Sequence, residues 1–416
     1  MTTTPTVAGR LVAFMADEIF PRHLEMQAFI ENNKPGTRPK FLATLQEKAR
    51  QQGLWNLGLP ELPDNAPGTR LTNTEFAPIA ETLGQIHWAA EVFNCQAPDL
   101  PNMEMLVKVG TAVQKERWLY PMLDGKIKSS FAMTEPNVAS SDALNIACKI
   151  TEDGDDFVLN GHKWFAGNVG LDCWQFIIVI GKSDPQAEPH ARHSAIIVPV
   201  ASNGLEVVRH VPVLGFQHRA KPHGEIRLNN VRVPRENLLG ERGKGFAAAQ
   251  VRLATARIHH CMRSIGGAEL MISLMVERAR ARKAFGKKLS EHDKIREFIA
   301  LSRVEVDQAR LLTLAAAEAL DAKGSKGARR EISMIKLAVA SACYNVADRA
   351  VQVFGAMGLT NDSPVADYFA QMRALRIYDG PDEVHVHSIA RHEFKRQQER
   401  EGAPLLRLLC RDLSLQ

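Results

Sequence analysis

The sequence predicts an α+β fold that is mostly helical, with a block of short strands between two helical regions. Apolar residues recur at helical spacing in the first third of the chain and again after Gly245, whereas short apolar runs separated by turns fill the middle. Strands and helices do not alternate in βαβ order, which disfavours a doubly wound dinucleotide-binding fold. The predicted domains are a helical domain at 1–128, a β domain at 129–240, a helical bundle at 241–400 and a tail at 401–416.

Two amphipathic segments support the helix prediction for the first domain. Residues 37–52 and 74–88 place apolar side chains three and four positions apart, and Thr74 is expected to cap the second segment. A loop rich in proline and glycine, residues 58–68, lies between them. The first domain is therefore expected to consist of helices joined by irregular loops.

The pattern changes to short strands at Ser129. Segments 143–151 and 157–160 flank the acidic turn 152–156, and this arrangement predicts a β-hairpin. Four further apolar runs predict strands, at 176–180, 194–200, 205–213 and 225–231.

After Gly245 the helical pattern returns and continues through the third domain. One apolar stripe has steps of three and four residues, which predicts a helix that faces the interior of a bundle. It consists of Ile332, Ile335, Val339, Ala342, Val346, Ala350 and Val353.

The composition is that of an ordinary soluble globular protein. The formal net charge of +5 suits a polyanionic ligand, but it is far from the clustered basicity of a nucleic-acid binder. No stretch has the apolar length of a membrane helix, so no membrane partner is expected. The six cysteines lie far apart and no N-terminal signal is recognisable, so the expected location is the cytoplasm, without disulfides or a zinc site.

Four segments carry residues suited to chemistry. Residues 131–142 offer hydroxyls and loop N–H groups that can cradle a flavin edge or a pyrophosphate, and 160–168 contain two adjacent aromatic residues that can present a ring to a flavin. The basic turn 280–288 can hold a phosphate, and 376–385 contain an Asp-Gly-Pro turn before a predicted helix. Taken singly, each of these patterns more often has a purely structural role.

Two other patterns give little indication of a ligand site. His385 and His387 are two residues apart, so on a helix they would not share a face and a metal site is not expected. Gly240, Gly243 and Gly245 do not have the spacing of a dinucleotide-binding fingerprint.

Together, in order and spacing, the four segments resemble the acyl-CoA dehydrogenase family over nearly the whole chain. The resemblance implies an N-terminal helical domain, a middle β-barrel or sandwich, a C-terminal four-helix bundle and an FAD cofactor. It also implies that Arg282 and Phe285, with Gln352 and Gly355, reach the FAD of a neighbouring subunit. The implied cofactor contacts are Phe131, Met133, Thr134, Ser140, Ser141, Phe165, Gly167, Arg282, Phe285, Gln352, Gly355, Asp382 and Glu383.

A narrower resemblance points to one branch of the family. Residues 92–99, 138–142, 257–263 and 379–385 are similar to the branch that in eukaryotes is often fused to an aminoglycoside-phosphotransferase-like kinase domain. Members of this branch are associated with 4-hydroxyacyl-CoA processed after phosphorylation.

The family resemblance implies removal of two hydrogens across the α–β bond of an acyl-CoA thioester. Tyr378-Asp379-Gly380 falls on the motif of the catalytic base, so Asp379 is expected to take the α-proton while a hydride leaves for flavin N5. The backbone N–H of the base residue and a flavin hydroxyl would bond the thioester oxygen. The implied substrate contacts are Ser141, Arg257, Tyr378 and Gly380.

The sequence departs from the family's usual pattern at several positions. The base is Asp379 where most members have Glu, and a second branch places its base at the position of Ala256 here. Phe165, beside Trp164, stands where a Trp usually stacks on the flavin, and Gly167 stands where a Ser or Thr usually bonds flavin N5.

The resemblance also implies partners and leaves alternatives open. An acyl-CoA substrate, a homo-oligomer (dimer or tetramer) and electron-transfer flavoprotein or a similar acceptor are expected, with no nucleic acid. The alternatives are processing of 4-hydroxy- or 4-phosphoryloxyacyl-CoA, a nitroalkane-oxidase-like flavoenzyme that shares the Asp base, and a non-enzymatic flavin-bearing protein associated with nucleic acid.

Overall fold

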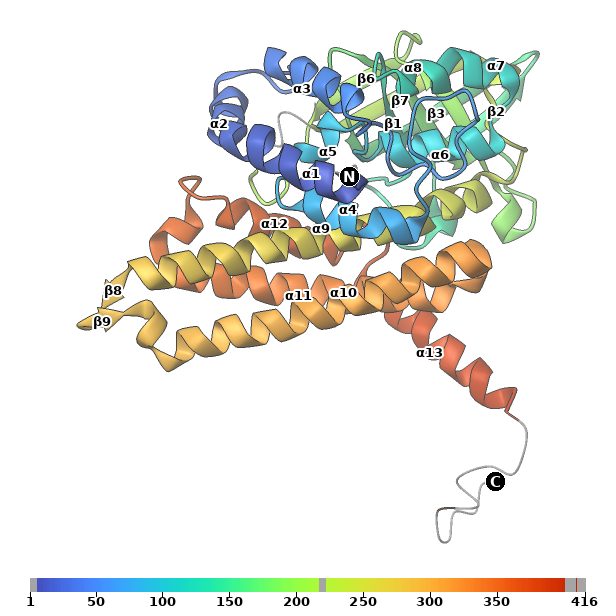
Figure 1. The fold of residues 1–416 in the computed structure, drawn as a ribbon. Coiled ribbons are helices and arrows are strands. Elements are labelled where there is room, and N and C mark those ends of the chain that lie inside the picture. Colours follow the sequence, from blue (N-terminus) through green and yellow to red (C-terminus); the bar gives the residue numbers. More distant parts are fainter. Residues whose placement is uncertain (1–5, 217–221, 401–408, 410–416) are drawn as a thin grey trace.

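The computed structural model describes residues 6–216, 222–400 and 409. A group of N-terminal helices and a curled sheet lie side by side on top of a bundle of long helices (Figure 1). The predicted order of helices, strands and helices is therefore confirmed. The predicted tail at 401–416 lies outside the described residues, apart from Leu409.

The N-terminal region is helical, as predicted, and the expected helix at 37–52 is present as α3. Its helices are α1 (Val7–Phe14), α2 (His23–Asn32), α3 (Lys40–Gln51), α4 (Asn73–Gly84), α5 (Ala89–Val92), α6 (Asp99–Val109), α7 (Ala112–Gln114) and α8 (Tyr120–Leu123).

The cap of α4 differs from the prediction. Thr72, and not Thr74, caps this helix: its hydroxyl accepts from the N–H of Glu75 at 3.2 Å, and the Glu75 carboxylate accepts from the N–H of Thr72 at 2.9 Å. This reciprocal pair satisfies two N–H groups at the helix start, which a cap at Thr74 would leave unpaired. The Thr74 hydroxyl instead donates to Asp321 at 2.7 Å and ties α4 to the bundle.

The middle region is a seven-stranded sheet in which the strands follow the order β1-β4-β2-β3-β7-β6, with β5 beside β4. The predicted hairpin is confirmed, since β2 and β3 pair antiparallel up to Asp153 and Asp156. Residues 143–145 form a single 3₁₀ turn and no strand, while β1 pairs parallel with β4. The strands are β1 (Lys128–Ala132), β2 (Lys149–Asp153), β3 (Asp156–Gly167), β4 (Trp174–Lys182), β5 (His193–Pro199), β6 (Leu205–His210) and β7 (His223–Pro234).

A buried ion pair fixes the loop after β1 against the sheet. Lys163 Nζ lies 2.7 Å from Glu135 Oε1 and also donates to the carbonyls of Met133 and Ile180. The Glu135 carboxylate in turn accepts from the N–H groups of residues 147 and 148. Because both charges are buried and fully hydrogen-bonded, removal of either partner would leave a costly unpaired charge, so the loop is held in one position.

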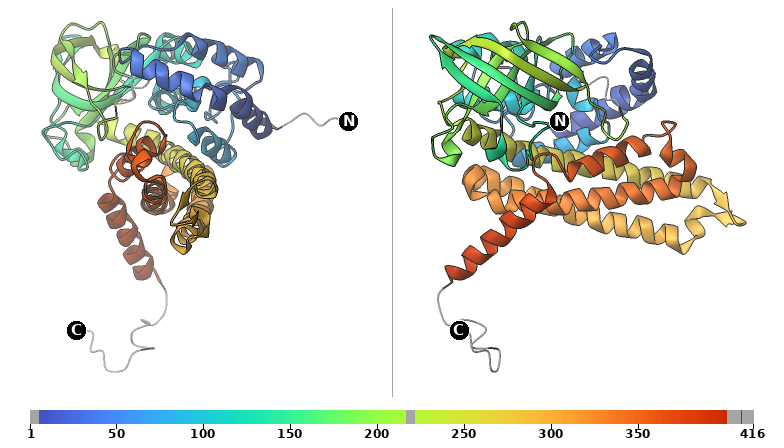
Figure 2. Two further views of the ribbon diagram at one scale, coloured as in Figure 1. Left: turned by 90° about the vertical axis from the view of Figure 1, so that its left-hand side faces the viewer. Right: turned by 180° about the vertical axis from the view of Figure 1, so that it is seen from behind.

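The C-terminal region is a bundle of long helices. The predicted apolar stripe lies on α11, and all seven of its side chains are buried. A two-stranded hairpin, β8 (Lys283–Ala284) and β9 (Lys287–Lys288), joins the first two helices at one end of the bundle, and α13 projects away from it (Figure 2). The helices are α9 (Gly245–Ala281), α10 (Asp293–Gly327), α11 (Arg329–Phe354), α12 (Val365–Leu375) and α13 (Asp382–Gln398).

Helix α9 joins the three regions, because it packs on α4, on α6, on β5 and on the other bundle helices. Its crossing with α4 is very close. A Cβ atom on Gly266 would lie 1.8 Å from the carbonyl oxygen of Glu81, and one on Gly84 would lie 2.0 Å from that of Arg263. Only glycine allows the two helices to approach this closely. The contact fixes the rotation of α9 about its own axis, and therefore which of its side chains face the space below the sheet.

Candidate active site

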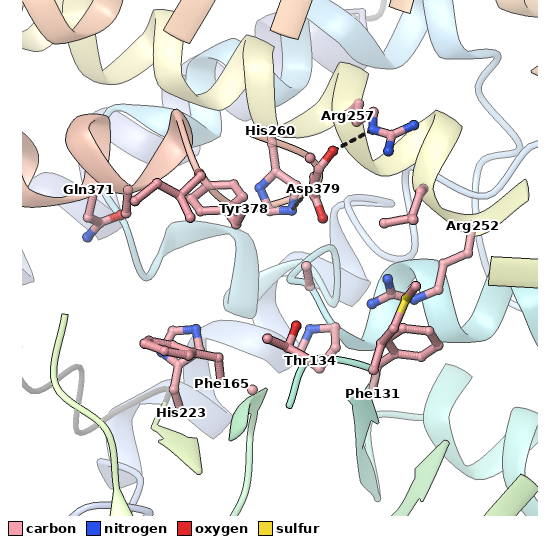
Figure 3. A pocket seen from close by; sticks show the side chains of 18 of the residues that line it. Phe131, Thr134, Phe165, His223, Arg252, Arg257, His260, Gln371, Tyr378 and Asp379 are labelled. Atoms are coloured by element: carbon pink, nitrogen blue, oxygen red, sulfur yellow. Dashed lines mark hydrogen bonds and ion pairs between the residues drawn. The ribbon is translucent and has the colours of Figure 1, made fainter. Parts of the chain in front are cut away.

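A cavity of about 1950 Å³ lies between the three regions. Ligand pockets usually measure roughly 300–1,000 Å³, so this cavity has room for more than one sizeable ligand. Figure 3 shows two walls that face each other across it. The helical wall consists of Arg257, His260, Tyr378 and Asp379; the sheet wall consists of Phe131, Thr134, Phe165 and His223.

Asp379 lies in a turn whose backbone is held from two sides. Its φ of 57° and the φ of 101° at Gly380 place the turn in the left-handed region, and Pro381 then caps α13. Its carbonyl oxygen accepts from Arg257 Nε at 2.8 Å and from His385 Nε2 at 3.3 Å. Burial, with the charge of Arg257, lowers the pKa of His385 to about 4, so this histidine is a neutral donor at physiological pH.

The same turn is tied to the bundle by Lys336. Its buried Nζ donates to the carbonyls of Leu375 at 2.7 Å and Tyr378 at 2.9 Å. Burial lowers the pKa of Lys336, and the carbonyl oxygens replace the water that it loses. The backbone on both sides of Asp379 is therefore fixed without use of its carboxylate.

The carboxylate of Asp379 faces the cavity. Its Oδ2 atom is buried and makes no hydrogen bond within the described part of the chain, although His260 Nε2 lies 3.5 Å away. The other ring nitrogen of His260 lies 3.2 Å from Nη2 of Arg263. Since a guanidinium can only donate, a neutral His260 must accept at Nδ1 and carry its proton on Nε2, on the side of Asp379. A carboxylate oxygen with a free lone pair is available in the cavity.

The sheet wall presents aromatic rings and small polar groups. Phe165 has a φ of 53° and is 41% exposed within the cavity, with Trp164 beside it. The indole Nε1 of Trp164 is buried and has no hydrogen-bond partner among the described residues. The carbonyl of Gly167 accepts from Ser130 Oγ at 2.6 Å. Gly167 also packs closely against Pro98, because a Cβ atom at this position would lie only 3.2 Å from Pro98 Cδ.

Three family models match the chain in sequence order. They are the N-terminal domain of acyl-CoA dehydrogenase at residues 6–126, the middle domain at 130–231 and the C-terminal domain at 243–394. The chain belongs to the acyl-CoA dehydrogenase family. As a member of this family it is an oxidoreductase, and the expected family and fold are confirmed.

Curated relatives include both long and short proteins. Acyl-CoA dehydrogenase family member 10 of Mus musculus is 47% identical over 93% of this chain, which spans only 36% of that relative. FadE2 of Mycobacterium tuberculosis is 46% identical over 94% of this chain and 95% of its own length. Family member 11 of Rattus norvegicus is 43% identical, and this chain spans half of it.

Two solved structures share the whole architecture of this chain. An acyl-CoA dehydrogenase homologue from Mycobacterium abscessus is 41% identical, with a TM-score of 0.91 over 95% of this chain and all of that chain. PigA, solved as an FAD complex, shares the fold at 20% identity with a TM-score of 0.81 over 95% of this chain and all of that chain.

The residues of the sheet wall fit a flavin. A flavin ring needs flat apolar contacts, and its polar edge needs donors; the exposed ring of Phe165 and the unpartnered indole N–H of Trp164 provide one of each. Most of the residues to which the family resemblance assigns contacts line this one cavity. They are Phe131, Met133, Thr134, Ser140, Ser141, Phe165, Gly167, Arg257, Tyr378, Asp379 and Gly380.

The other residues to which the family resemblance assigns cofactor contacts lie outside the cavity of this chain. Arg282 and Phe285 lie at the β8–β9 hairpin, at the end of the bundle opposite to α13 (Figure 1). Phe285 is 97% exposed. Gln352 and Gly355 lie at the C-terminal end of α11, and Gly355 is its C-cap. A second group lies at the start of α13, where Asp382 pairs with Arg376 at 2.7 Å and Glu383 is exposed.

Sequence reasoning missed several groups that the structure places in the cavity. Gln250, Leu253, His260 and Ser264 lie on one face of α9 together with the predicted contact Arg257, at steps of three and four, and all of them line the cavity. That periodicity is visible in the sequence and could have identified His260 as a neighbour of Arg257. Arg252 lies beside this face, and nothing in the sequence indicates that its charge is buried.

No group of side chains suited to a metal ion occurs among the residues that the structure describes. Within the same residues, the helices are too short or too polar to cross a membrane. Five cysteines, Cys95, Cys148, Cys173, Cys261 and Cys343, have free thiols; the sixth, Cys410, lies outside the described residues.

Proposed function

We propose that this protein is an FAD-dependent acyl-CoA dehydrogenase that removes two hydrogens across the α–β bond of an acyl-CoA thioester. The observation that carries the proposal is the carboxylate of Asp379. The Asp379 side chain lines a cavity whose opposite wall suits a flavin, and its carboxylate makes no hydrogen bond to a described residue. A general base needs this combination: a free lone pair, a fixed position and room for the substrate carbon beside it.

Asp379 takes the α-proton of the thioester. The proton is weakly acidic, so the negative charge that develops on the thioester oxygen must be stabilised at the same time. The backbone N–H of Asp379 makes no hydrogen bond with the described residues and is available as that donor. Bonds from Arg257 and His385 to the carbonyl of Asp379 hold this peptide in place during the transfer.

The residues of the sheet wall hold the cofactor. Phe165 supports the flavin ring, while Thr134, Ser140 and Ser141 on the loop after β1 supply hydroxyls and N–H groups. Bound FAD supplies the acceptor for the hydride that leaves the β-carbon. Gly167 offers no side-chain hydroxyl, so only backbone groups act at this position.

The site is completed by a second copy of the chain. Phe285 is 97% exposed at the hairpin tip, which is unusual for a large aromatic side chain unless a partner covers it. Arg282 and Phe285, with Gln352 and Gly355, contact the FAD of a neighbouring subunit in a dimer or tetramer. Electrons then pass to electron-transfer flavoprotein or a similar acceptor, and the chain acts in β-oxidation.

Anaerobic titration of the flavinated protein with acyl-CoA thioesters tests this function. Straight-chain acyl-CoA should bleach the oxidised flavin. Bleaching by nitroalkanes and not by any CoA ester would support the nitroalkane-oxidase-like alternative. No bleaching by either class would overturn the proposed dehydrogenation.

A further inference from the structure

Arg252 is a buried cation in the wall of the active-site cavity. Its side chain is on α9, five residues before Arg257, and only 7% of its surface is exposed. It forms no ion pair with any residue that the structure describes. A guanidinium without a carboxylate partner is costly inside a protein, so its position calls for an explanation.

The surroundings of Arg252 hold it in one orientation. Its Nε donates to Asn102 Oδ1 at 3.0 Å, and the amide of Asn102 is itself fixed because Nδ2 donates to Ser129 Oγ at 2.9 Å and to the carbonyl of Ser130 at 3.2 Å. The guanidinium carbon lies 4.0 Å from the centre of the Phe131 ring. Figure 3 shows the guanidinium over this ring, in the space below Asp379. These contacts use one nitrogen and one face of the guanidinium.

The two terminal nitrogens of Arg252 receive no acceptor from the described residues. Burial lowers the pKa of Arg252 to about 10, so the group is still charged at physiological pH. Asp379 and Glu104 are the carboxylates that act on it electrostatically. Glu104 is already engaged, since it accepts from Thr255 at 2.9 Å and from Lys108 at 3.0 Å.

The two neighbouring arginines on α9 differ from Arg252 in this respect. Arg257 donates to the carbonyl of Asp379, and Arg263 donates to Gln96 at 2.8 Å and contacts His260. Both therefore have roles within the protein that account for their burial. Arg252 instead lies in the same cavity as Asp379 with a fixed position, and its two terminal nitrogens have no acceptor among the described residues.

We propose that Arg252 forms an anion subsite for the acyl group, and that the substrate bears an oxyanion, a carboxylate or a phosphate, on the carbon chain beyond the reacting bond. The two terminal nitrogens match the spacing of two oxygens of such a group. This inference rests on the proposed function, because it assumes that the acyl chain occupies the space between Asp379 and Phe131.

The test compares acyl-CoA thioesters of equal chain length on the flavinated enzyme and its variants. The chains end in a methyl group or a carboxylate, or carry a 4-hydroxyl or a 4-phosphoryloxy group. Affinity is measured from the change in the flavin spectrum on binding, and reduction is measured anaerobically.

Three variants complete the test. Arg252→Met removes the charge and keeps an apolar side chain, while Arg252→Lys keeps the charge but lacks the two terminal NH2 groups of the guanidinium. Arg117→Met is the matched control, because Arg117 also lies over an aromatic ring, 4.6 Å from the Trp118 ring centre, but outside the cavity.

Wild-type enzyme should bind one of the anionic chains about 10- to 100-fold more tightly than the uncharged chain, the range expected of a charge-assisted bidentate contact. Arg252→Met should abolish this preference, Arg252→Lys should keep part of it and Arg117→Met should keep all of it. Whichever of the two anionic thioesters binds more tightly shows whether the subsite takes a carboxylate or a phosphate.

Three results would contradict the proposals. Equal affinity of wild type for charged and uncharged chains would overturn the anion subsite even if no variant folds. Loss of FAD from Arg252→Met with unchanged chain preference would also overturn it and assign the residue to the cofactor. Failure of every thioester to bleach the flavin would instead refute the proposed function itself.

Discussion

Nε2 of His260 lies 3.5 Å from Oδ2 of Asp379, and Arg263 fixes the other side of the same imidazole ring at 3.2 Å. The Arg263 contact sets which nitrogen of the neutral ring carries the proton, and thereby points an N–H at the carboxylate. His260 also contacts the ring of Tyr378 edge-on, with 5.3 Å between ring centres. His260 is therefore a positioning residue for Asp379 in the proposed reaction.

Replacing His260 should slow flavin reduction without loss of substrate binding. His260→Leu removes the N–H that faces Asp379. We expect this 3.5 Å contact to shorten to a hydrogen bond when substrate binds, so its loss should lower the reduction rate by roughly tenfold. His260→Asn keeps a donor and should lose less. Stopped-flow reduction with the best acyl-CoA, together with KM, provides the measurement. His392→Leu, outside the cavity, is the control; an equal effect there, or a change in KM alone, would contradict the assignment.

Asp379→Asn should slow flavin reduction by about 10²–10⁴-fold, the usual value of general-base catalysis. The amide keeps the shape of the side chain, and the backbone bonds from Arg257 and His385 do not involve the carboxylate, so FAD and acyl-CoA binding should persist. Asp379→Glu keeps a base with longer reach and should retain some activity with a changed chain-length preference.

A second variant tests the same assignment from the other base position. Ala256→Glu in the Asp379→Asn background should recover part of the rate if α9 can present a carboxylate to the same carbon. Reduction of Asp379→Asn at the wild-type rate would leave Asp379 as a turn residue only.

Gly167→Ser should alter the flavin spectrum or the reduction rate, because it introduces a hydroxyl on the sheet wall. The new Cβ atom would lie 3.2 Å from Pro98 Cδ, so the two segments must separate by a few tenths of an ångström. Gly167→Ala introduces the same Cβ without the hydroxyl and is the matched control. Identical spectra and rates for the Ser and Ala variants would show that no flavin atom is in reach of this position.

Arg282→Glu should lower FAD occupancy if this residue contacts a neighbouring subunit's cofactor. Flavin content per chain and the mass of the assembly by light scattering provide the measurement. Lys323→Glu makes the same charge change on the exposed surface of α10 and should leave both unchanged. A fully flavinated and active monomer would contradict the predicted dimer or tetramer.

Acidification should destabilise the protein between pH 6.5 and about 4. Burial lowers the pKa of His259 to about 3, and that of His193 and His385 to about 4, from the ordinary 6.5. In this window the unfolded chain binds protons at these positions and the folded chain does not, so the free energy of unfolding falls as the pH falls. Urea unfolding at pH 7.0 and 5.0 measures the difference, and His259→Phe should reduce it.

The parts of the fold that depend on local periodicity were predictable from the sequence. The stripe from Ile332 to Val353 needed only its spacing, and the Asp379-Gly380-Pro381 turn was recognisable because Pro381 suits the start of a helix. The cap at Thr72 was missed by two residues, although Glu75 three positions later is the signal of a capping box.

Contacts between distant segments were not predictable. The parallel pairing of β1 with β4 joins residues more than forty positions apart, and no local pattern specifies it. Arg252 shows the same limit for the site. Its burial depends on Asn102 and Phe131, which approach it only after the N-terminal helices, the sheet and α9 have packed together.

Helix α9 runs without interruption from Gly245 to Ala281, and Arg282 follows directly at its C-cap. In the proposed oligomer, this one helix therefore holds Arg257 at one catalytic centre and Arg282 near a second one, roughly 37 Å further along at 1.5 Å per residue. The angle between the directions in which the two arginines leave the helix depends only on the number of residues between them. A single inserted residue after Ser264 would leave the cavity face of α9 in place and turn Arg282 by about 100° around the helix axis. On the proposed assignment, the length of this segment is as strict a requirement as the identity of the residues at its two ends.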